Sequence, residues 1–451
     1  MTPPLVLLFS PRATNTTGEN IRMTDIGNSA GRAEQYDVSQ GDGSNLLHSK
    51  AVGLIGVLFL TVTGAAPISA MLGNVPFGAG AGLGLYMPAA FLVATIVLTI
   101  FSVGYAAMAT KVSSVGGFYS FISHGLGREV GLAAGISSAA AYSIFEASLY
   151  GLFAFFGAAK LKELTGTDVP WPYLAGFCVV LAAILSYFDV KISSWILGIA
   201  LIGEVLILLI FDIATLTTTS LTTNFDPSAL YPQNVLTGFA AHTTKGGVDL
   251  TAGFAAVGIF MAFWSWVGFE MAPNYAEESK EPKRIIPISL YFSVIALGLF
   301  YTFTSFCAVA AYPSADEMLV AAQKDAGNFF LNPMEKYGGV FFRDVMSYLI
   351  LTSSFACGLA FHNTASRYFY SLGREGVLPS FLGFTQSRSK SPYAASFFQS
   401  FLAAIWVGLF AFFYGTNDPN AQAYVGLYTL LAILGTMLVL ILQRRDTSPR
   451  G

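Results

Sequence analysis

The residues with the clearest chemical potential lie in one apolar segment, residues 259–287. Ser265, Gly268 and Glu270 interrupt its hydrophobic run near mid-length. A carboxylate inside a membrane segment is costly, and it commonly marks the path of a substrate or an ion. A glycine beside aromatic residues at mid-span favours a helix that breaks around a ligand. This segment therefore predicts a set of binding residues: Phe263, Trp264, Ser265 and Gly268.

A second apolar stretch, residues 51–72, is interrupted in a similar way. Pro67 lacks a backbone donor, and Gly64 tolerates unusual dihedral angles, so the helix is expected to unwind near residues 63–67. The freed N–H groups and the positive end of the following half-helix suit a carboxylate. A proline kink without a ligand is the alternative. The predicted binding residues in this stretch are Thr63, Gly64, Ala65, Ala66 and Pro67.

Further carboxylates lie in other apolar stretches. Tyr142, Glu146 and Tyr150 are spaced four residues apart and therefore share one helix face. If Glu146 faces the binding site, a cationic amine becomes a plausible ligand. Glu204 has no basic residue within two helical turns, so we expect it to hold a proton part of the time and to serve in a proton relay. The alternative for each glutamate is a hydrogen bond to a neighbouring helix. Asp212 is expected at the membrane interface.

The apolar stretch 345–372 is unusually rich in hydroxyl groups. Thr352 and Ser353 could supply oxygens to a small cation, although such side chains often bond only to their own backbone. His362 is expected to have a helix-packing role. Metal-ligand spacings, phosphate loops and catalytic triads are absent from the sequence. The sequence therefore predicts neither an enzyme nor a bound cofactor or metal.

Composition places these residues in a polytopic membrane protein. The chain has 451 residues, of which 54% are hydrophobic and 11% are charged, whereas a soluble domain carries roughly 25% charged residues. Helices are expected, because membrane strands require a closed barrel. We expect the lipid bilayer, and not nucleic acid, as the surroundings. Ten stretches are long enough to span it: 51–72, 84–110, 131–159, 171–188, 193–216, 251–275, 286–312, 345–372, 394–414 and 421–442.

Basic residues predict the orientation of these spans. With the N-terminus inside, 17 Lys and Arg residues fall on the inner side and 6 on the outer side, which favours cytoplasmic termini. We expect a short helix near residues 315–324 outside, and an amphipathic surface helix within the inner loop 111–130.

The two interrupted spans are the first and the sixth, which points to two inverted halves of five helices. The expected organisation is a disordered cytoplasmic tail (1–47), a first five-helix repeat (48–216), an extracellular loop (217–250), a second repeat (251–442) and a cytoplasmic tail (443–451).

Three motifs give the chain a resemblance to the amino acid–polyamine–organocation permeases over about residues 48–442. The first is the segment 264–287. The second joins Asn363 and Arg367 to the glycine-rich residues 373–379, and the third is Gly116, Gly117 and the following Phe-Tyr. The resemblance implies an all-α, LeuT-type fold with a five-plus-five inverted repeat and alternating access. Most relatives have twelve spans, so the last two are expected to be missing here, as in a truncated gene.

The resemblance also implies roles for single residues. Trp264 matches an aromatic residue that gates the substrate pocket, and Glu270 matches a glutamate used in coupling or transport. Residues 63–67 match the unwound carboxylate-binding segment, but relatives are richer in glycine there, which questions ordinary α-amino-acid recognition. Glu204 occupies a position where some members carry a lysine that replaces a sodium ion.

Together these features predict a secondary transporter of amino acids or related amines in the plasma membrane, driven by protons or by exchange. Two alternatives remain. One is a transport-inactive sensor or scaffold with the same fold. The other is a sodium-coupled symporter in which Thr352 and Ser353 bind the ion and Glu204 acts as a counter-charge.

Overall fold

The computed structural model describes residues 52–112, 116–187, 190–218, 226–237, 244–245, 248–249, 255–386 and 391–446. The predicted N-terminal tail lies outside the described residues, as do much of the predicted loop 217–250 and most of the predicted C-terminal tail.

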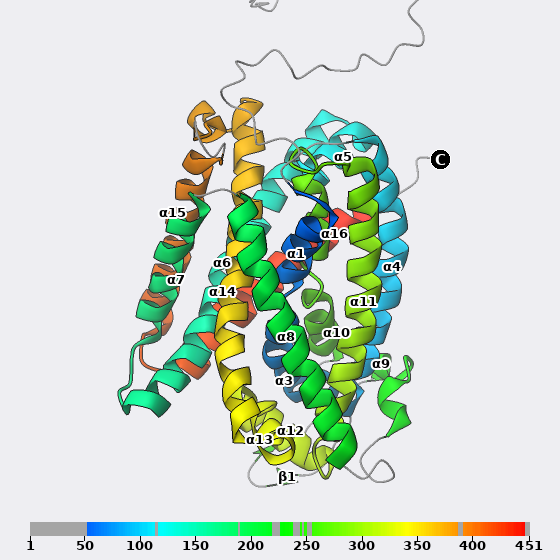
Figure 1. Cartoon of the computed structure of the whole chain (residues 1–451), viewed down its shortest axis with the longest axis vertical. Helices are drawn as coiled ribbons and strands as arrows, with labels where there is room; N and C mark the ends of the chain where they lie inside the picture. The colour runs from blue at the N-terminus through cyan, green and yellow to red at the C-terminus, as the bar shows by residue number, and fades with distance from the viewer. Residues whose placement is uncertain are drawn as a thin grey trace, which may run out of the picture. The chain divides into compact units, whose positions relative to one another are not determined.

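Helices make up nearly all of the described structure (Figure 1). The label η marks a 3₁₀ or π segment. The first half contains α1 (Leu54–Ala65), α2 (Pro67–Ser69), η3 (Ala70–Asn74), α3 (Val75–Gly78), η4 (Ala79–Leu83), η5 (Gly84–Tyr86), α4 (Met87–Lys111), α5 (Gly117–Leu126), α6 (Arg128–Thr165), α7 (Trp171–Ser186) and α8 (Val190–Thr218).

The connection to the second half contains η6 (Pro227–Leu230), α9 (Asn234–Thr237) and a two-stranded antiparallel hairpin of β1 (Thr244–Lys245) and β2 (Val248–Asp249). The second half contains α10 (Ala255–Trp264), η7 (Phe269–Tyr275), α11 (Pro282–Ala310), α12 (Ala315–Lys324), η8 (Ala326–Asn328), α13 (Leu331–Gly338), α14 (Val340–Arg374), η9 (Ser380–Gly383), α15 (Tyr393–Tyr414), η10 (Pro419–Leu430) and α16 (Leu431–Asp446).

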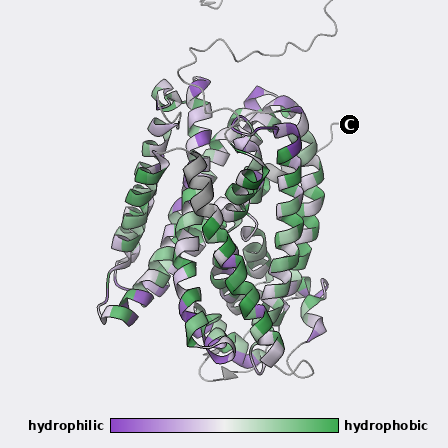
Figure 2. Ribbon diagram, in the orientation of Figure 1, coloured by the Kyte–Doolittle hydropathy of each residue, from purple (hydrophilic) through white to green (hydrophobic). Residues whose placement is uncertain are grey.

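The predicted apolar stretches all form helices. Eight helical runs among the described residues are long and apolar enough to cross a membrane, and α7 is a shorter apolar helix. The first run, Leu54–Lys111, turns back at η5 and therefore holds the first two predicted spans (Figure 1). Hydrophobic residues predominate along the long helices, and hydrophilic residues gather near the two ends of the bundle (Figure 2). The protein is an all-helical polytopic membrane protein, as predicted.

The first span breaks where the sequence predicts. Helix α1 ends at Ala65, Ala66 adopts a left-handed conformation with φ 41°, and α2 begins at Pro67. The Ala66 N–H turns back to the carbonyls of Val62 and Thr63. Proline suits the first position of a new helix because it needs no donor there.

The sixth span also breaks at mid-length. Helix α10 ends at Trp264, and Gly268 has φ 125° before η7 begins at Phe269. A Cβ atom on Gly268 would lie 2.4 Å from the carbonyl carbon of Gly64 and 2.8 Å from the nitrogen of Ala65. The two breaks therefore meet backbone to backbone, and glycine is required at this contact.

A buried ion pair and backbone hydrogen bonds hold the helices together at the end of the bundle where α5 lies. Arg367 of α14 makes a bidentate ion pair with Glu278 at distances down to 2.7 Å. Val52 pairs with the backbone of Glu278 and Lys280, which attaches the start of the first span to the same place.

Helix α5 differs from the predicted surface helix. Its residues Gly117 to Ile122 are buried, and the helix packs against α6 and η7. Tyr119 donates a hydrogen bond to Glu375. Burial, together with this carboxylate, raises the pKa of Tyr119 to about 12, so its hydroxyl stays protonated as a donor.

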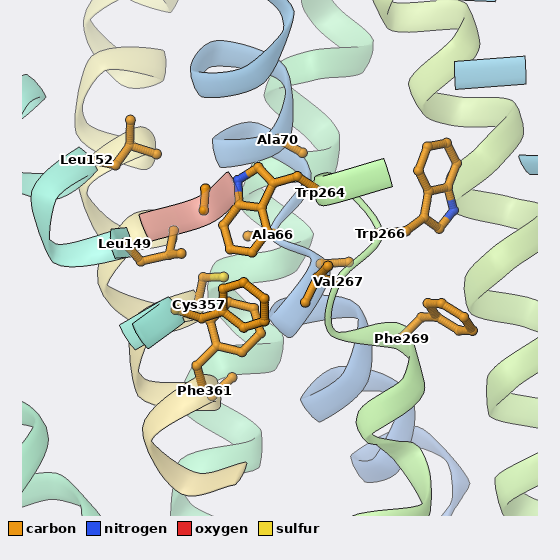
Figure 3. Packing of buried hydrophobic residues seen from close by; sticks show 14 of the residues in the cluster. Ala66, Ala70, Leu149, Leu152, Trp264, Trp266, Val267, Phe269, Cys357 and Phe361 are labelled. Atoms are coloured by element: carbon orange, nitrogen blue, oxygen red, sulfur yellow. The ribbon is translucent and has the colours of Figure 1, made fainter. Parts of the chain in front are cut away.

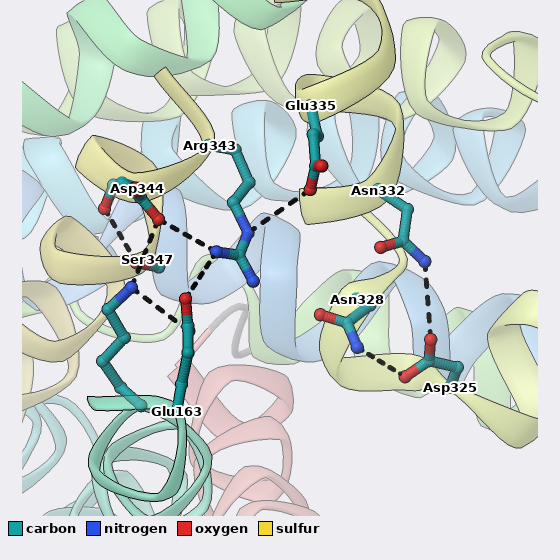
Figure 4. A network of polar contacts seen from close by, with 9 residues as sticks. Glu163, Asp325, Asn328, Asn332, Glu335, Arg343, Asp344 and Ser347 are labelled. Carbon is teal, nitrogen blue, oxygen red and sulfur yellow. Dashed lines mark hydrogen bonds and ion pairs between the residues drawn. The ribbon is translucent and has the colours of Figure 1, made fainter. Parts of the chain in front are cut away.

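An ion-pair network ties α6 to α13 and α14 at the opposite end of the bundle (Figure 4). Lys160 lies 3.2 Å from both Glu163 and Asp344, and Arg343 bridges Glu163, Asp344 and Glu335 at 2.8 to 3.8 Å. Helix α12 lies at this end and matches the short helix predicted at 315–324.

Candidate substrate and coupling sites

A small cavity lies where the two helix breaks meet. Its volume is about 10 Å³, which is room for about one water molecule. Five of the predicted binding residues line it: Gly64, Ala65, Ala66, Trp264 and Ser265. The other lining residues are Ser69, Ala70, Asn74, Leu149, Val267, Cys357, Phe361 and Tyr428. No charged side chain is among these lining residues.

Trp264 lines this cavity, whereas Trp266 points to another part of the bundle (Figure 3). The Trp264 ring lies 4.6 Å from the ring of Phe145 and 6.1 Å from that of Phe361, between centroids. Its indole N–H donates to the Tyr428 hydroxyl at 3.0 Å. Trp266 instead packs against Phe91 and Tyr301. The two tryptophans thus have different surroundings, and only Trp264 is placed to contact a ligand in this cavity. Its role as a gate stays a prediction.

Polar side chains from three elements meet on one wall of the cavity. Asn74 of η3 donates to Ser265 at 2.7 Å and accepts from the hydroxyl of Tyr428 in η10. Tyr424, one turn earlier in η10, donates to the carbonyl of Gly73. Asn74, Tyr424 and Tyr428 were not among the predicted binding residues. The sequence signal that could have indicated this site is Asn74 itself, a polar residue in an apolar run shortly after the predicted break.

Other predicted binding residues lie outside the cavity. Thr63 is buried in the last turn of α1, and Pro67 starts α2 behind Ala66. Gly268 packs on Gly64. Phe263 lines a separate small apolar cavity beside Glu270.

Glu270 joins the sixth span to α6. One carboxylate oxygen accepts from the Tyr142 hydroxyl at 2.7 Å, and the other accepts from the N–H of Gly268 at 2.9 Å. Tyr105 donates to its backbone carbonyl. The residue thus holds the turn after the break and is itself fully buried. Tyr142 does not line the cavity, but its ring lies 6.0 Å from that of the lining residue Phe361, between centroids.

Glu204 of α8 lies beside the start of α2, where the first span resumes. Its carboxylate accepts from the N–H of Ile68 at 3.4 Å, and its other oxygen has no partner among the described residues. A carboxylate is favourable at the positive end of a helix. A substrate carboxylate was predicted at this helix end. In the structure, the carboxylate of Glu204 occupies it instead.

Hydroxyl groups of α14 lie close to this acid. Ser69 donates to Ser353 at 2.9 Å and lies 3.4 Å from the hydroxyl of Ser354. Thr352 is not part of this group, because it is exposed on another face of α14 and bonds the carbonyl of Leu349. Consecutive helical residues point about 100° apart, so Ser354 takes the place predicted for Thr352.

Two further acids differ from expectation. Glu146 is buried away from the cavity, where it bonds His362 and Gln399. Asp212 is not exposed at the surface of the bundle: it is buried against α11 and accepts from Thr304 at 2.8 Å. The surroundings of both acids depend on which neighbouring helix their own helix face contacts, and this cannot be read from their position in the sequence.

Comparison with known families identifies this arrangement. The model of the amino acid permease family matches residues 56–442. The chain belongs to the amino acid permease family. This family belongs to the amino acid–polyamine–organocation superfamily, and we refer to the protein below as the permease.

Relatives of known sequence are distant. An uncharacterized transporter, Rv1979c of Mycobacterium tuberculosis, is 25% identical over 66% of this chain and 61% of its own length. Branched-chain amino acid permease BcaP of Lactococcus lactis is 25% identical over 66% and 63%. Low-affinity putrescine importer PlaP of Escherichia coli is 23% identical over 68% and 64%. The alignments thus span about three-fifths of the length of these relatives.

A solved structure shows the same fold. A Na⁺-coupled sialic acid symporter in a substrate-bound, outward-open state superposes with a TM-score of 0.55, covering 86% of the permease and 78% of that chain, at 12% identity. This likeness confirms the predicted LeuT-type fold.

Proposed function

We propose that the permease moves neutral amino acids with apolar side chains across the plasma membrane by alternating access. The observation that carries this proposal is the cavity at the two helix breaks, which apolar and uncharged polar residues line. Leu149, Val267, Phe361 and Trp264 would surround an aliphatic side chain. The polar side chains of Asn74, Ser265 and Tyr428, which line the same cavity, would serve the ammonium and carboxylate groups.

A cationic amine fits this site less well. Its second ammonium group would need a carboxylate in the cavity, and the acid considered for this role, Glu146, is bonded to His362 and Gln399 instead. Among the relatives, one is named for branched-chain amino acids and another for putrescine. The chemistry of the cavity supports the first kind of substrate for this chain.

Alternating access follows from the size of the cavity. A space of about 10 Å³ cannot hold an amino acid, so the breaks must separate before a substrate enters. The backbone contact between Gly64 and Gly268 allows this, because it lacks interlocking side chains. The ion pair of Arg367 with Glu278 would keep the α5 end closed while the other end opens.

We further propose that a proton drives transport and that Glu204 carries it. When Glu204 is ionised, it favours the positive end of α2, and when it is neutral this attraction weakens. A change of charge at this point would therefore shift the two halves of the first span relative to each other. Sodium is the second candidate, because the oxygens of Ser69, Ser353 and Ser354 gather beside the same acid.

The proposed orientation places both termini in the cytoplasm. Its support is the excess of basic residues on that side, 17 against 6. The α5 end of the bundle is then the inner end, and the α12–α13 end is the outer one.

Uptake by the purified full chain in proteoliposomes tests this function. We expect accumulation of radiolabelled leucine under an imposed inward proton gradient, with little inhibition by putrescine or arginine. A sodium gradient is applied separately as the second arm. Stronger inhibition by putrescine than by valine would contradict the substrate class. Binding of leucine without uptake under either gradient would favour the transport-inactive sensor.

A further inference from the structure

Four buried polar side chains form a cluster that the transport mechanism does not use. His362 Nδ1 lies 3.0 Å from each carboxylate oxygen of Glu146, and its Nε2 lies 2.8 Å from the Ser396 hydroxyl. Gln399 donates to Glu146 at 2.6 Å. We call Glu146, His362, Ser396 and Gln399 the buried polar cluster. It joins α6, α14 and α15.

The cluster holds these helices in one rotational position. Glu146, His362 and Gln399 are completely buried, and a charged or polar group inside a membrane protein is costly without partners. Glu146 has two donors here, and both nitrogens of His362 are used. A rotation of α6 or α14 would leave these groups unpaired, so the cluster opposes it.

The chain neighbours of the cluster pack against Trp264 at the substrate cavity. Phe145 precedes Glu146, and Phe361 precedes His362. Their rings lie 5.2 Å apart between centroids, and both contact the ring of Trp264. Phe361 lines the cavity directly. Because neighbouring side chains on a helix keep a fixed angle, a helix that is held at Glu146 is also held at Phe145.

We propose that the buried polar cluster sets the shape of the substrate cavity by positioning Phe145 and Phe361 against Trp264. Glu146 and His362 are then positioning residues for the substrate side chain, although neither touches the substrate. The claim about the substrate rests on the proposed function, whereas the claim about the cavity wall does not.

The cavity wall can be tested without transport, because Cys357 lines the cavity. The other two cysteines are replaced by alanine, and the rate of Cys357 modification by a small methanethiosulfonate is measured in detergent. We expect Glu146→Ala and His362→Ala to raise this rate by about tenfold each, and the double variant to raise it no further, because the two residues act as one unit.

Asp212→Ala is the matched control. Asp212 is an equally buried, hydrogen-bonded acid that lies on α8 and not in the cluster. We expect it to lower the melting temperature without changing the rate at Cys357. Unchanged modification in both cluster variants, or rates that multiply in the double variant, would overturn the proposal. If the alanine variants do not fold, Glu146→Met and His362→Phe replace them under the same criteria, because these side chains fill the space but cannot form the hydrogen bonds of the cluster.

Leucine uptake then tests the link to substrate. Glu146→Ala is expected to raise KM by about tenfold while the maximal rate changes less than about twofold. Glu146→Gln keeps an acceptor for His362 and should restore most of the affinity. An unchanged KM beside a faster modification of Cys357 would overturn the role in substrate binding. If the wild type fails to transport, the proposed function is wrong, while the Cys357 result still decides the role in the cavity wall.

Discussion

Two tryptophans separated by one residue have different surroundings in this permease. Trp264 contacts the cavity and donates to Tyr428, whereas Trp266 packs between Phe91 and Tyr301. We expect Trp264→Leu to weaken leucine binding by about tenfold, since the smaller side chain would leave part of the bound leucine side chain exposed and about 1.4 kcal/mol of lost apolar burial corresponds to that factor. Trp266→Leu should change binding much less. Binding measured by scintillation proximity compares them, and equal small effects would argue against a gate.

The charge of Glu204 is a second property that single substitutions can test. Glu204→Gln keeps the shape and an acceptor for Ile68 but cannot titrate. We expect it to abolish accumulation under a proton gradient while leaving leucine counterflow intact, because exchange needs no net proton movement. The matched variant is Asp212→Asn on the same helix, which should retain proton-driven uptake. Undiminished proton-driven accumulation by Glu204→Gln would remove this acid from the mechanism.

At the level of elements, the break in the first span depends on an unusual backbone conformation. Among the described residues, Ala66 is the only non-glycine residue with a positive φ. Such a conformation costs a residue with a Cβ atom about 1–2 kcal/mol. This backbone strain lies at the proposed binding site. Local sequence predicts the position of this break but not its left-handed form.

Substitution by glycine should therefore act in opposite directions at two nearby alanines. We expect Ala66→Gly to raise the melting temperature in detergent, because glycine adopts this conformation without strain. Ala70→Gly should lower it, since Ala70 is helical with φ −62° and glycine costs about 1 kcal/mol in a helix. A loss of stability in both variants would show that Ala66 is not strained.

The break in the sixth span requires glycine for a steric reason. A Cβ atom on Gly268 would meet the backbone of Gly64 at 2.4 Å, whereas one on Gly104 of α4 would meet nothing within 4 Å. We expect Gly268→Ala to abolish uptake or folding and Gly104→Ala to be tolerated. Uptake and size-exclusion profiles report both outcomes. Normal uptake by Gly268→Ala would mean that the two breaks are not packed together in the working protein.

At the level of the whole molecule, the proposed orientation has a direct test. Gln233 and Lys280 are both exposed, and the natural cysteines are buried. Gln233 directly precedes α9, which lies at the α12 end of the bundle (Figure 1), whereas Lys280 bonds Val52 at the opposite end, where the first span begins. Ser279, which directly precedes Lys280, is buried, so a cysteine there would resist labelling from either side of the membrane. We expect Gln233→Cys to react with an impermeant maleimide in intact cells and Lys280→Cys to react only after permeabilisation. The reverse pattern would invert the topology.

The membrane class, the apolar spans, the two helix breaks and the family motifs could be predicted from the order of the amino acids. Each of these is a local property: a run of apolar residues must leave water, and Gly64, Pro67 and Gly268 act on the backbone where they stand. The short helix α12 was predictable for the same reason.

Contacts between side chains of different helices could not be predicted in this way. Glu146 faces His362 rather than the cavity, Glu204 reaches Ile68, and Ser354 lies where Thr352 was predicted. The reason is geometric, because one residue along a helix turns a side chain by about 100°. Which face of each helix meets which neighbour depends on packing between spans far apart in the chain, and no local pattern records it.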